Sequence, residues 1–333
     1  MGALSLKTGV RPGSLNVRVH TLCYNSGSMP TRQGSIHLFR FSGIDLYLHW
    51  SWFLLAVYEI RGGIGTYSSV GWNVAEYLAL FVIVTMHEFG HALACRQVGG
   101  RANQIVLWPL GGVAYVDPPP RPGATLWSIA AGPLVNVALI PVLLILGTTS
   151  RSLGWAKAVP DADSLLGMVW WINSRLLIFN MLPIYPLDGG QILRSLLWFV
   201  LGRARSLMVA VILGFVGVVA FIGFAVLRQS AWLGILALFM LMNCWGGLQH
   251  ARALLRFAKL PRRNGFACPE CKTAPPVGEL WKCGQCEQTF DTFQTGAVCP
   301  RCGMQYPVTK CLDCGRAHPM SEWAEAALMA PRL

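Results

Sequence analysis

Three residues of the segment His87-Glu-Phe-Gly-His91 have the types and the spacing of a metal-dependent hydrolytic site. Side chains four residues apart project from the same face of a helix, so both imidazoles can bind one ion. Two neutral imidazoles suit zinc, which takes a roughly tetrahedral set of ligands. Glu88 can accept the proton of a water that zinc has acidified, as that water attacks a carbonyl. The alternative is a chance match, but ionisable groups in an apolar helix cost free energy.

Zinc needs a third protein ligand, for which Asp188 is the candidate. It ends a second apolar stretch, in Asn180-Met-Leu-Pro-Ile-Tyr-Pro-Leu-Asp-Gly-Gly190. Its alternative role is that of a turn residue at a helix end, before two glycines. Asn136 and Asn180 are uncharged polar residues in apolar stretches, so either could donate to the substrate or to a developing oxyanion. A hydrogen bond between helices is their alternative role.

Six apolar stretches are expected to position these residues as membrane-spanning helices. The chain is 54% hydrophobic and 13% charged, whereas soluble domains carry about 25% charged residues. A spanning helix needs about 20 apolar residues, and ionisable groups inside one usually face protein or a wet cavity. The stretches are Leu46–Ile60, Asn73–Arg96, Thr125–Gly147, Leu165–Leu187, Ser206–Leu227 and Ala231–Gln249. Between the second and third, residues 103–116 predict a short membrane-associated β-hairpin.

Basic residues are distributed unequally between the two sides that six spans define. Six spans place both termini on one side, and only four of the 27 Lys and Arg residues lie on the other. These four are Arg61, Arg151, Lys157 and Arg228. Because positive residues favour the cytoplasmic side, both termini are expected in the cytoplasm of a multi-pass cell-membrane protein. The zinc ligands then lie near the cytoplasmic face, and most of the net charge of +12 requires no nucleic-acid partner.

Eight of the eleven cysteines form four Cys-x-x-Cys pairs near the C-terminus, which is typical of zinc ribbons. The pairs are Cys268/Cys271, Cys283/Cys286, Cys299/Cys302 and Cys311/Cys314. This segment has few large apolar residues, so metal binding must supply much of its folding energy. We expect two structural zinc ions, one shared by the first and second pairs and one by the third and fourth. Interleaved pairing is the alternative, and the nearly neutral charge favours a protein partner over nucleic acid.

These features divide the chain into five parts. They are a flexible N-terminal extension over residues 1–40, a transmembrane domain over 41–250, a basic linker over 251–263, a double zinc ribbon over 264–318, and a short C-terminal helix or tail over 319–333. Within the extension, Met29 is a second candidate for the start of the protein. The expected fold is an all-α polytopic membrane protein with about six transmembrane helices, a short β-hairpin and a small zinc-ribbon tail.

The two ligand motifs resemble those of the site-2 protease family of intramembrane zinc metalloproteases, and its sporulation-factor-processing members in particular. The resemblance covers about residues 41–250. It rests on His87-Glu-Phe-Gly-His91 and Asn180-x-x-Pro-x-x-Pro-Leu-Asp188-Gly, with Ala131-Gly-Pro-Leu-Val-Asn136 and Pro109-Leu-Gly-Gly112. It implies peptide-bond hydrolysis in or near transmembrane segments of membrane proteins. It also implies one catalytic zinc bound by His87, His91 and Asp188, a catalytic Glu88, and a polar role for Asn180 at the active site.

Two other functions fit parts of the sequence. A catalytically silent membrane scaffold, whose ribbons bind a regulatory partner, has no need of Glu88 between two metal ligands. A zinc transporter or sensor needs ligands along several spans, whereas the sequence has one compact cluster. An active zinc peptidase is therefore the expected function.

Overall fold

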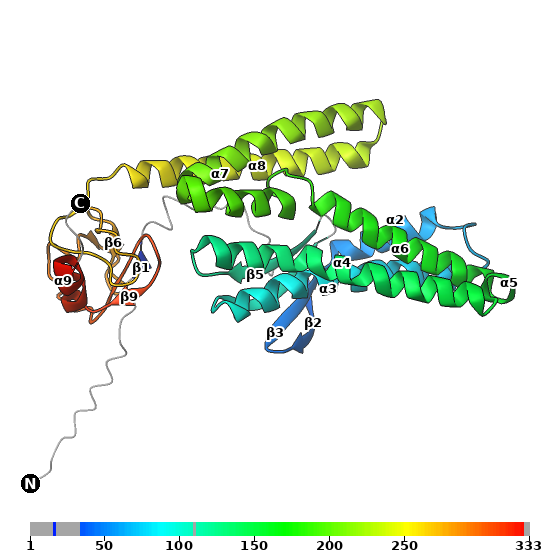
Figure 1. Ribbon diagram of the computed structural model, residues 1–333, viewed down its shortest axis with the longest axis horizontal. Coiled ribbons are helices and arrows are strands. Elements are labelled where there is room, and N and C mark those ends of the chain that lie inside the picture. Colours follow the sequence, from blue (N-terminus) through cyan, green and yellow to red (C-terminus); the bar gives the residue numbers. More distant parts are fainter. Residues whose placement is uncertain (1–15, 18–33, 109–110, 330–333) are drawn as a thin grey trace, which may run out of the picture. The chain divides into compact units, whose positions relative to one another are not determined.

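The computed structural model describes residues 16–17, 34–108 and 111–329, and the chain forms two compact units. The helical unit comprises residues 26–252, and the C-terminal unit comprises residues 253–333 together with the chain up to residue 25. Figure 1 shows long helices in the first unit and short strands with one helix in the second. Each unit is described separately below.

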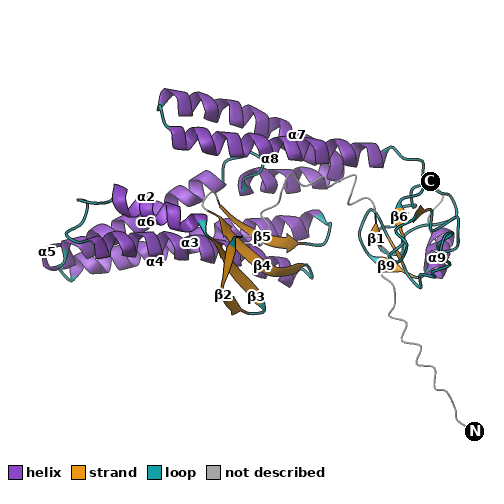
Figure 2. Cartoon of the chain, turned by 180° about the vertical axis from the view of Figure 1, so that it is seen from behind, coloured by secondary structure: helices purple, strands orange, loops and turns teal. Residues whose placement is uncertain are grey.

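Four helices among the described residues are long and apolar enough to cross a membrane. They are α3 (Val70–Gln97), α4 (Pro122–Ser152), α7 (Asp188–Leu227) and α8 (Ala231–Ala258). Their exposed side chains are mostly Leu, Val, Ile and Phe, as expected of a surface that lipid solvates. α3 and α4 pack together with α6 (Pro160–Asn180), while α7 and α8 run side by side (Figures 1 and 2).

The prediction that Leu46–Ile60 is one helix is wrong. Its first residues belong to the strand β3 (Ile44–His49), and the helix α2 (Ser51–Gly62) follows. β3 is an inner strand whose side chains alternate between more and less buried positions, so its apolar character serves a sheet. α2 has 12 residues, about 18 Å of helix against a hydrocarbon core of about 30 Å.

The predicted fourth span, Leu165–Leu187, is displaced along the chain. Its helix α6 begins at Pro160 and ends at Asn180, and residues 181–187 form turns. Pro183 and Pro186 lie in those turns, where they have no backbone N–H to extend a helix. A short helix α5 (Trp155–Ala158) precedes α6. The predicted fifth span, 206–227, is the second part of α7, whose axis changes direction at Gly202, with a φ of 76°.

The predicted hairpin forms, but as part of a larger sheet. β4 (Arg101–Trp108) and β5 (Gly111–Asp117) pair antiparallel, and β3 pairs with β4 in parallel. β2 (Ser35–Phe41) completes the order β2-β3-β4-β5, visible in Figure 2. β2 occupies residues assigned above to a flexible extension, most of which lies outside the described residues. An all-α fold with a lone hairpin is therefore an incomplete prediction.

The sheet packs against α3, the helix that carries the two histidines. Ile44 and Leu46 of β3 and Ile105 and Leu107 of β4 are fully buried in one core with Cys95 of α3. Burial of such side chains contributes about 1.5–3 kcal/mol each. The sheet is thus an apolar support beneath the last turns of α3.

The C-terminal unit consists of two short hairpins and one helix. The elements are β6 (Trp281–Lys282) with β7 (Thr289–Phe290), β8 (Thr309–Lys310) with β9 (Ala317–His318), and α9 (Met320–Met329). β1 (Asn16–Val17) pairs with β6. Phe293 lies in the core between Trp281 and Trp323, with ring centroids 5.4 and 4.9 Å away. The short helix expected after residue 319 is α9.

Close packing of α3 on α4 depends on Gly90. A Cβ at this position would lie 2.7 Å from the carbonyl oxygen of Ala131, which is part of the backbone of α4. Gly90→Ala should therefore force the helices apart and lower the stability of the helical unit by about 1–3 kcal/mol. The measurement is the Tm of the purified protein in detergent.

Gly147→Ala is the matched control for this substitution. Gly147 also lies in α4, but a Cβ there would meet nothing within 4 Å. Because alanine has the higher helix propensity, this variant should be neutral or slightly stabilised. Equal Tm values for the two variants would contradict the packing described for Gly90.

Candidate metal centres

Three acceptor atoms from two helices converge in the helical unit. His87 and His91 lie one turn apart on α3, and Asp188 is the first residue of α7. The Nε2 atoms of the two histidines are 3.0 Å apart. Oδ2 of Asp188 lies 3.1 Å from Nε2 of His87 and 3.5 Å from Nε2 of His91. The structure therefore brings the three predicted ligands together.

The separations of these three atoms suit a zinc ion. Ligands held at about 2.0–2.1 Å in a tetrahedral zinc site lie about 3.3 Å from one another. All three side chains are largely or fully buried, and Oδ2 of Asp188 has no hydrogen-bond donor among the described residues. A buried carboxylate oxygen without a donor is costly unless a cation is present.

The tautomers of the two histidines follow from their other ring nitrogens. Nδ1 of His87 lies 2.6 Å from Oδ1 of Asn136, and Nδ1 of His91 lies 2.9 Å from the carbonyl oxygen of Ser128. Both partners are acceptors, so each Nδ1 donates its hydrogen and each Nε2 keeps a lone pair. Two lone pairs and a carboxylate oxygen facing one point form a donor set for a cation.

The orientation of the Asn136 amide is fixed by Asn173 of α6. Nδ2 of Asn173 donates to the backbone oxygen of Asn136 at 3.0 Å, and that oxygen can only accept. Oδ1 of Asn173 therefore faces Nδ2 of Asn136, which donates to it at 2.8 Å. Oδ1 of Asn136 is left to face His87. Both asparagines are fully buried, so hydrogen bonds occupy both ends of the Asn136 amide.

Asn173 is the residue of this site that the sequence analysis missed. It lies in α6, in an apolar stretch, as Asn136 and Asn180 do in theirs. The available signal was therefore a third uncharged polar residue within an apolar helix. Asn180 ends α6 and makes no side-chain hydrogen bond with a described residue.

A glycine leaves room for the ring of His91. A Cβ at Gly132 of α4 would lie 2.2 Å from Nε2 of His91. Glu88 is 7% exposed and follows His87 directly on α3. Gly189 and Gly190 approach the backbone of residues 181–185 so closely that a Cβ at either would lie within about 2.5 Å of a backbone atom. These glycines bring the start of α7 against the turns that precede it.

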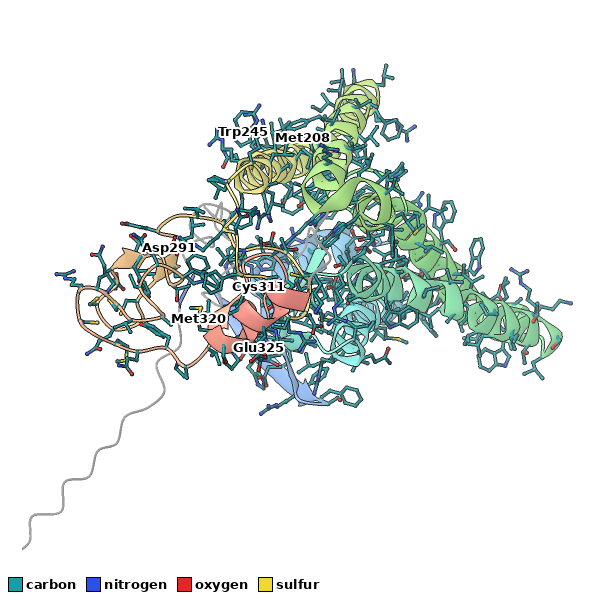
Figure 3. The ribbon with its side chains drawn as sticks, turned by 60° about the vertical axis from the view of Figure 1, so that its left-hand side comes forward. Met208, Trp245, Asp291, Cys311, Met320 and Glu325 are labelled. Carbon is teal, nitrogen blue, oxygen red and sulfur yellow. The ribbon has the colours of Figure 1, made fainter. Side chains whose placement is uncertain are left out.

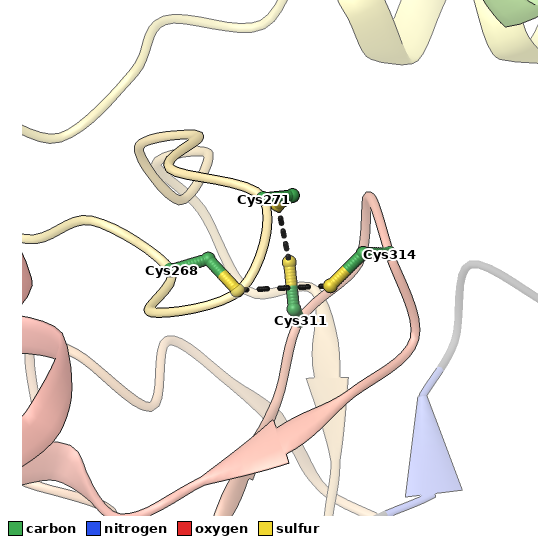
Figure 4. A group of neighbouring side chains, drawn as sticks. All are labelled: Cys268, Cys271, Cys311 and Cys314. Carbon is green, nitrogen blue, oxygen red and sulfur yellow. Dashed lines mark hydrogen bonds between the residues drawn. The ribbon is translucent and has the colours of Figure 1, made fainter. Parts of the chain in front are cut away.

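The cysteines form two sets of four, but not the sets expected above. Cys268 Sγ lies 3.6 Å from Cys314, and Cys271 Sγ lies 3.8 Å from Cys311 (Figure 4). In the other set, Cys283 lies 3.6 Å from Cys302 and Cys286 lies 3.6 Å from Cys299. Zinc–sulfur distances of about 2.3 Å correspond to sulfur–sulfur separations of about 3.8 Å, so each set could hold a zinc ion.

The prediction that consecutive pairs share a metal is therefore wrong. The first pair joins the fourth and the second joins the third, so one centre is nested inside the other along the chain. Arg262, from the predicted basic linker, donates to Asp313 at 2.7 and 3.2 Å and ties the start of the unit to the fourth pair. Trp281 Nε1 donates to the carbonyl oxygen of Lys310 at 3.2 Å and joins the two hairpins.

All four Cys-x-x-Cys turns share one backbone pattern. The N–H of the first cysteine donates to the carbonyl five residues on, and its carbonyl accepts from the N–H four residues on. In each turn the residue four positions after the first cysteine has a φ between 59° and 75°. These residues are Lys272, Glu287, Gly303 and Gly315. Two of the turns thus use glycine where the left-handed conformation is needed, and two do not.

Asp291, labelled in Figure 3, directly follows β7. Two contacts of its carboxylate tie the segment between the two hairpins to the start of the unit. Its carboxylate is buried and accepts from Arg263 at 2.6 Å and from the backbone N–H of Gly278 at 3.0 Å.

In the inner sulfur set, which contains Cys283, Tyr306 donates its hydroxyl to Cys283 Sγ at 3.0 Å. Burial raises the pKa of Cys283, but this bond and backbone N–H groups outweigh burial and lower the pKa to about 6. The thiolate form of Cys283 is therefore favoured over its thiol form.

Comparisons with known proteins match the helical unit. Residues 75–163 and 155–224 match the family described as Peptidase family M50. A zinc metalloprotease of Methanocaldococcus jannaschii is 35% identical over 180 residues, covering 54% of this chain and 50% of that protein. Stage IV sporulation protein FB of Bacillus subtilis is 31% identical over 125 residues, covering 36% of this chain and 40% of that protein. This chain thus spans half or less of the length of these relatives.

A solved structure is also similar. The site-2 protease from Methanocaldococcus jannaschii is 29% identical, with a TM-score of 0.47, and the match covers 64% of this chain and 95% of that chain. The residues matched by the peptidase family contain both histidines, Glu88 and Asp188, and the three asparagines discussed above.

Paired cysteine substitutions test the nested arrangement of the two sulfur sets. Cys271→Ser and Cys311→Ser should each remove the same zinc ion, so the double variant should lose no more zinc than either single variant. Cys271→Ser with Cys286→Ser should lose two ions, because the two cysteines belong to different centres. Zinc per chain is measured by inductively coupled plasma mass spectrometry. Loss of two ions from the Cys271/Cys311 double variant would contradict the nesting.

Proposed function

We propose that the protein is an intramembrane zinc metalloprotease, because residues 75–224 match the family described as Peptidase family M50. Its substrates are membrane proteins, cut in or near their transmembrane segments. The observation that carries the proposal is the convergence of three acceptor atoms from α3 and α7 beside a buried glutamate. Relatives named zinc metalloproteases support it.

Each residue of the site has a separate role in this proposal. His87, His91 and Asp188 hold the catalytic zinc, which supplies Lewis-acid activation for hydrolysis when bound. Glu88 takes the proton from the attacking water and returns it to the departing amine. Asn136 and Asn173 hold the imidazole of His87 and keep its hydrogen on Nδ1.

The two asparagines named from the sequence have different roles in the proposal. Both ends of the Asn136 amide are hydrogen-bonded, to His87 and to Asn173, so Asn136 positions His87 as a zinc ligand. Asn180 keeps its amide hydrogens for a substrate carbonyl or for the oxyanion that develops during attack, because no described residue accepts them.

The C-terminal unit binds two structural zinc ions in the proposal, so the chain holds three. The nested sulfur sets support this number, and metal binding supplies folding energy to a unit with a small core. In the proposed organisation, residues 41–250 form the protease domain and residues 264–318 form the double ribbon.

The ribbons bind a protein partner in this proposal. Crosslinking from the ribbon surface, followed by identification of the captured proteins, tests the partner.

We also propose that both termini are cytoplasmic. The distribution of Lys and Arg supports this orientation. It requires six crossings, four by the long apolar helices and two by α2 and α6 with their flanking residues. Arg175 of α6 lies 4.3 Å from the Trp171 ring, a contact that shields its charge along this helix.

Glu88→Gln tests the catalytic role directly. Glutamine keeps the size of the side chain but cannot accept the proton, so cleavage of a single-span substrate in proteoliposomes should fall by about 10²–10⁴-fold. Zinc content should stay at three ions per chain. If the protein is instead a scaffold without activity, the parent will not cleave the substrate either. Cleavage by Glu88→Gln at the parent's rate would overturn the mechanism.

Asn136→Ala and Asn180→Ala should separate metal positioning from catalysis. Loss of the Asn136 bond should weaken zinc binding about 10–100-fold, measured by competition with a chelator. Asn180→Ala should keep zinc affinity and lower kcat by about 10²–10³-fold if the side chain stabilises the oxyanion. The reverse result, with zinc lost only in Asn180→Ala, would contradict both assignments.

Reporter fusions test the topology. Alkaline phosphatase fused within residues 63–69, after α2, should be active outside the cytoplasm, and green fluorescent protein fused at residue 333 should fluoresce inside. The loop at residues 153–154, after α4, should behave as residues 63–69 do, because α3 and α4 together return the chain to the same side. Phosphatase that is inactive at residues 63–69 would rule out a crossing by α2.

A further inference from the structure

The turn segment that leads to Asp188 packs against both α7 and α8. It comprises residues 181–187, which connect the end of α6 to Asp188, the first residue of α7. Ile184 and Tyr185 of this segment pack against buried side chains of the two helices, namely Val218, Met240 and Cys244. The segment before the third predicted ligand is therefore attached to residues that lie much further along the chain.

Glycines leave the space that these two side chains occupy. A Cβ at Gly217 of α7 would lie 2.4 Å from Cγ1 of Ile184. A Cβ at Gly247 of α8 would lie 2.6 Å from Cε1 of Tyr185, an atom of a rigid ring. Carbon atoms in contact are about 3.5–4.0 Å apart, so an added methyl group would have to displace either side chain by about 1 Å.

Hydrogen bonds connect these contacts to the backbone next to Asp188. The thiol of Cys244 donates to the carbonyl oxygen of Tyr185, with 2.8 Å between sulfur and oxygen. The N–H of Leu187 donates to the carbonyl oxygen of Ile184 at 2.8 Å, and Leu187 directly precedes Asp188. A shift of Ile184 or Tyr185 would therefore also move the start of α7.

The position of Asp188 is the part of the ligand set that depends on this segment. His87 and His91 share α3, so the spacing between them follows from that helix alone. Oδ2 of Asp188 comes from another helix and lies 3.1 and 3.5 Å from the two Nε2 atoms. Ligand distances in a metal site are fixed to about 0.2 Å. A displacement of about 1 Å in the adjoining turn exceeds that tolerance.

We propose that Ile184 and Tyr185 are positioning residues for Asp188, and that Gly217 and Gly247 provide the space that holds them. The second part of α7 and α8 thereby set the place of the third ligand, although neither glycine belongs to the ligand set. This role rests on the zinc site proposed above and deepens it.

Zinc affinity of the intact protein in detergent tests this role. A chelator competes for the metal, and the ion bound by the helical unit is the one that His91→Ala loses. Gly247→Ala should bind this ion about 10–100-fold more weakly, the usual effect of losing a group that orients a ligand. The two ions of the cysteine sets should stay bound as tightly as in the parent.

Gly246→Ala is the matched control, because it adds the same methyl group at the adjacent position of α8. A Cβ at Gly246 would meet nothing within 4 Å, so this variant should keep the parent's zinc affinity. Equal affinities of Gly246→Ala and Gly247→Ala would overturn the positioning role alone. A parent that binds no ion in the helical unit would overturn the proposed zinc site and the positioning role with it.

A double-mutant cycle distinguishes positioning of Asp188 from a general loosening of the helices. Asp188→Ala removes the ligand, so adding Gly247→Ala to it should weaken zinc binding no further. If the two losses of affinity add instead, Gly247 does not act through Asp188 and the proposal is overturned.

Cys244 offers a milder test that does not depend on how well Gly247→Ala folds. Cys244→Ala removes the donor to Tyr185 and should weaken zinc binding about 3–10-fold, as expected for one hydrogen bond. Cys244→Ser keeps a donor at this position and should stay close to the parent. Parent-like affinity in Cys244→Ala, or an equal loss in both variants, would contradict a role of this bond in positioning Asp188.

Discussion

The helical unit is organised around an unfavourable arrangement of three acceptor atoms. Nε2 of His87, Nε2 of His91 and Oδ2 of Asp188 lie within 3.5 Å of one another, in helices whose outer surfaces are apolar. Without a cation, two lone pairs and a carboxylate at this separation repel one another. Their approach therefore depends on packing that holds α3, α4 and the start of α7 in place. A zinc ion bound by the three atoms would convert that repulsion into coordination.

The packing that brings these atoms together relies on an absence of side chains. Gly90 allows α3 to approach the backbone of α4, and Gly132 leaves space for the ring of His91. Gly189 and Gly190 allow the start of α7 to lie against the backbone of the preceding turns. The sheet adds support from the other side, since β3 and β4 bury their apolar side chains against the end of α3. The close packing of α3 on α4 and the burial of the sheet against α3 together determine the positions and orientations of both imidazoles.

A backbone carbonyl decides which nitrogen of His87 faces His91 and Asp188. The backbone oxygen of Asn136 can only accept, so it orients the side-chain amide of Asn173. That amide orients the side-chain amide of Asn136, whose Oδ1 accepts the hydrogen of His87 Nδ1. Buried hydrogen bonds of this kind are strong because the surroundings are apolar. In the ribbons, the cysteines are positioned mainly by backbone hydrogen bonds. Each Cys-x-x-Cys pair is held by its own turn, and contacts between residues far apart in the chain, such as Arg262–Asp313, bring two pairs together.

The sequence by itself determined the chemistry of the sites. Spacing within one turn of helix predicted the two histidines and Glu88 together, and local Cys-x-x-Cys turns predicted sulfur ligands, because both depend on residues close in the chain. Apolar stretches predicted the long helices α3, α4, α7 and α8, since a run of lipid-facing residues needs no partner to be recognised.

Tertiary structure decided everything that depends on distant partners. The run at 46–60 became a strand and a short helix because β3 found hydrogen-bond partners on both sides. The cysteine pairs nested because contacts across the unit, absent from any local pattern, join its start to its end. Asn173 reached the site, and its hydrogen bonds oriented the Asn136 amide, only when α4 and α6 packed together. Local chemistry can be inferred from composition and spacing, whereas pairing depends on which surfaces meet.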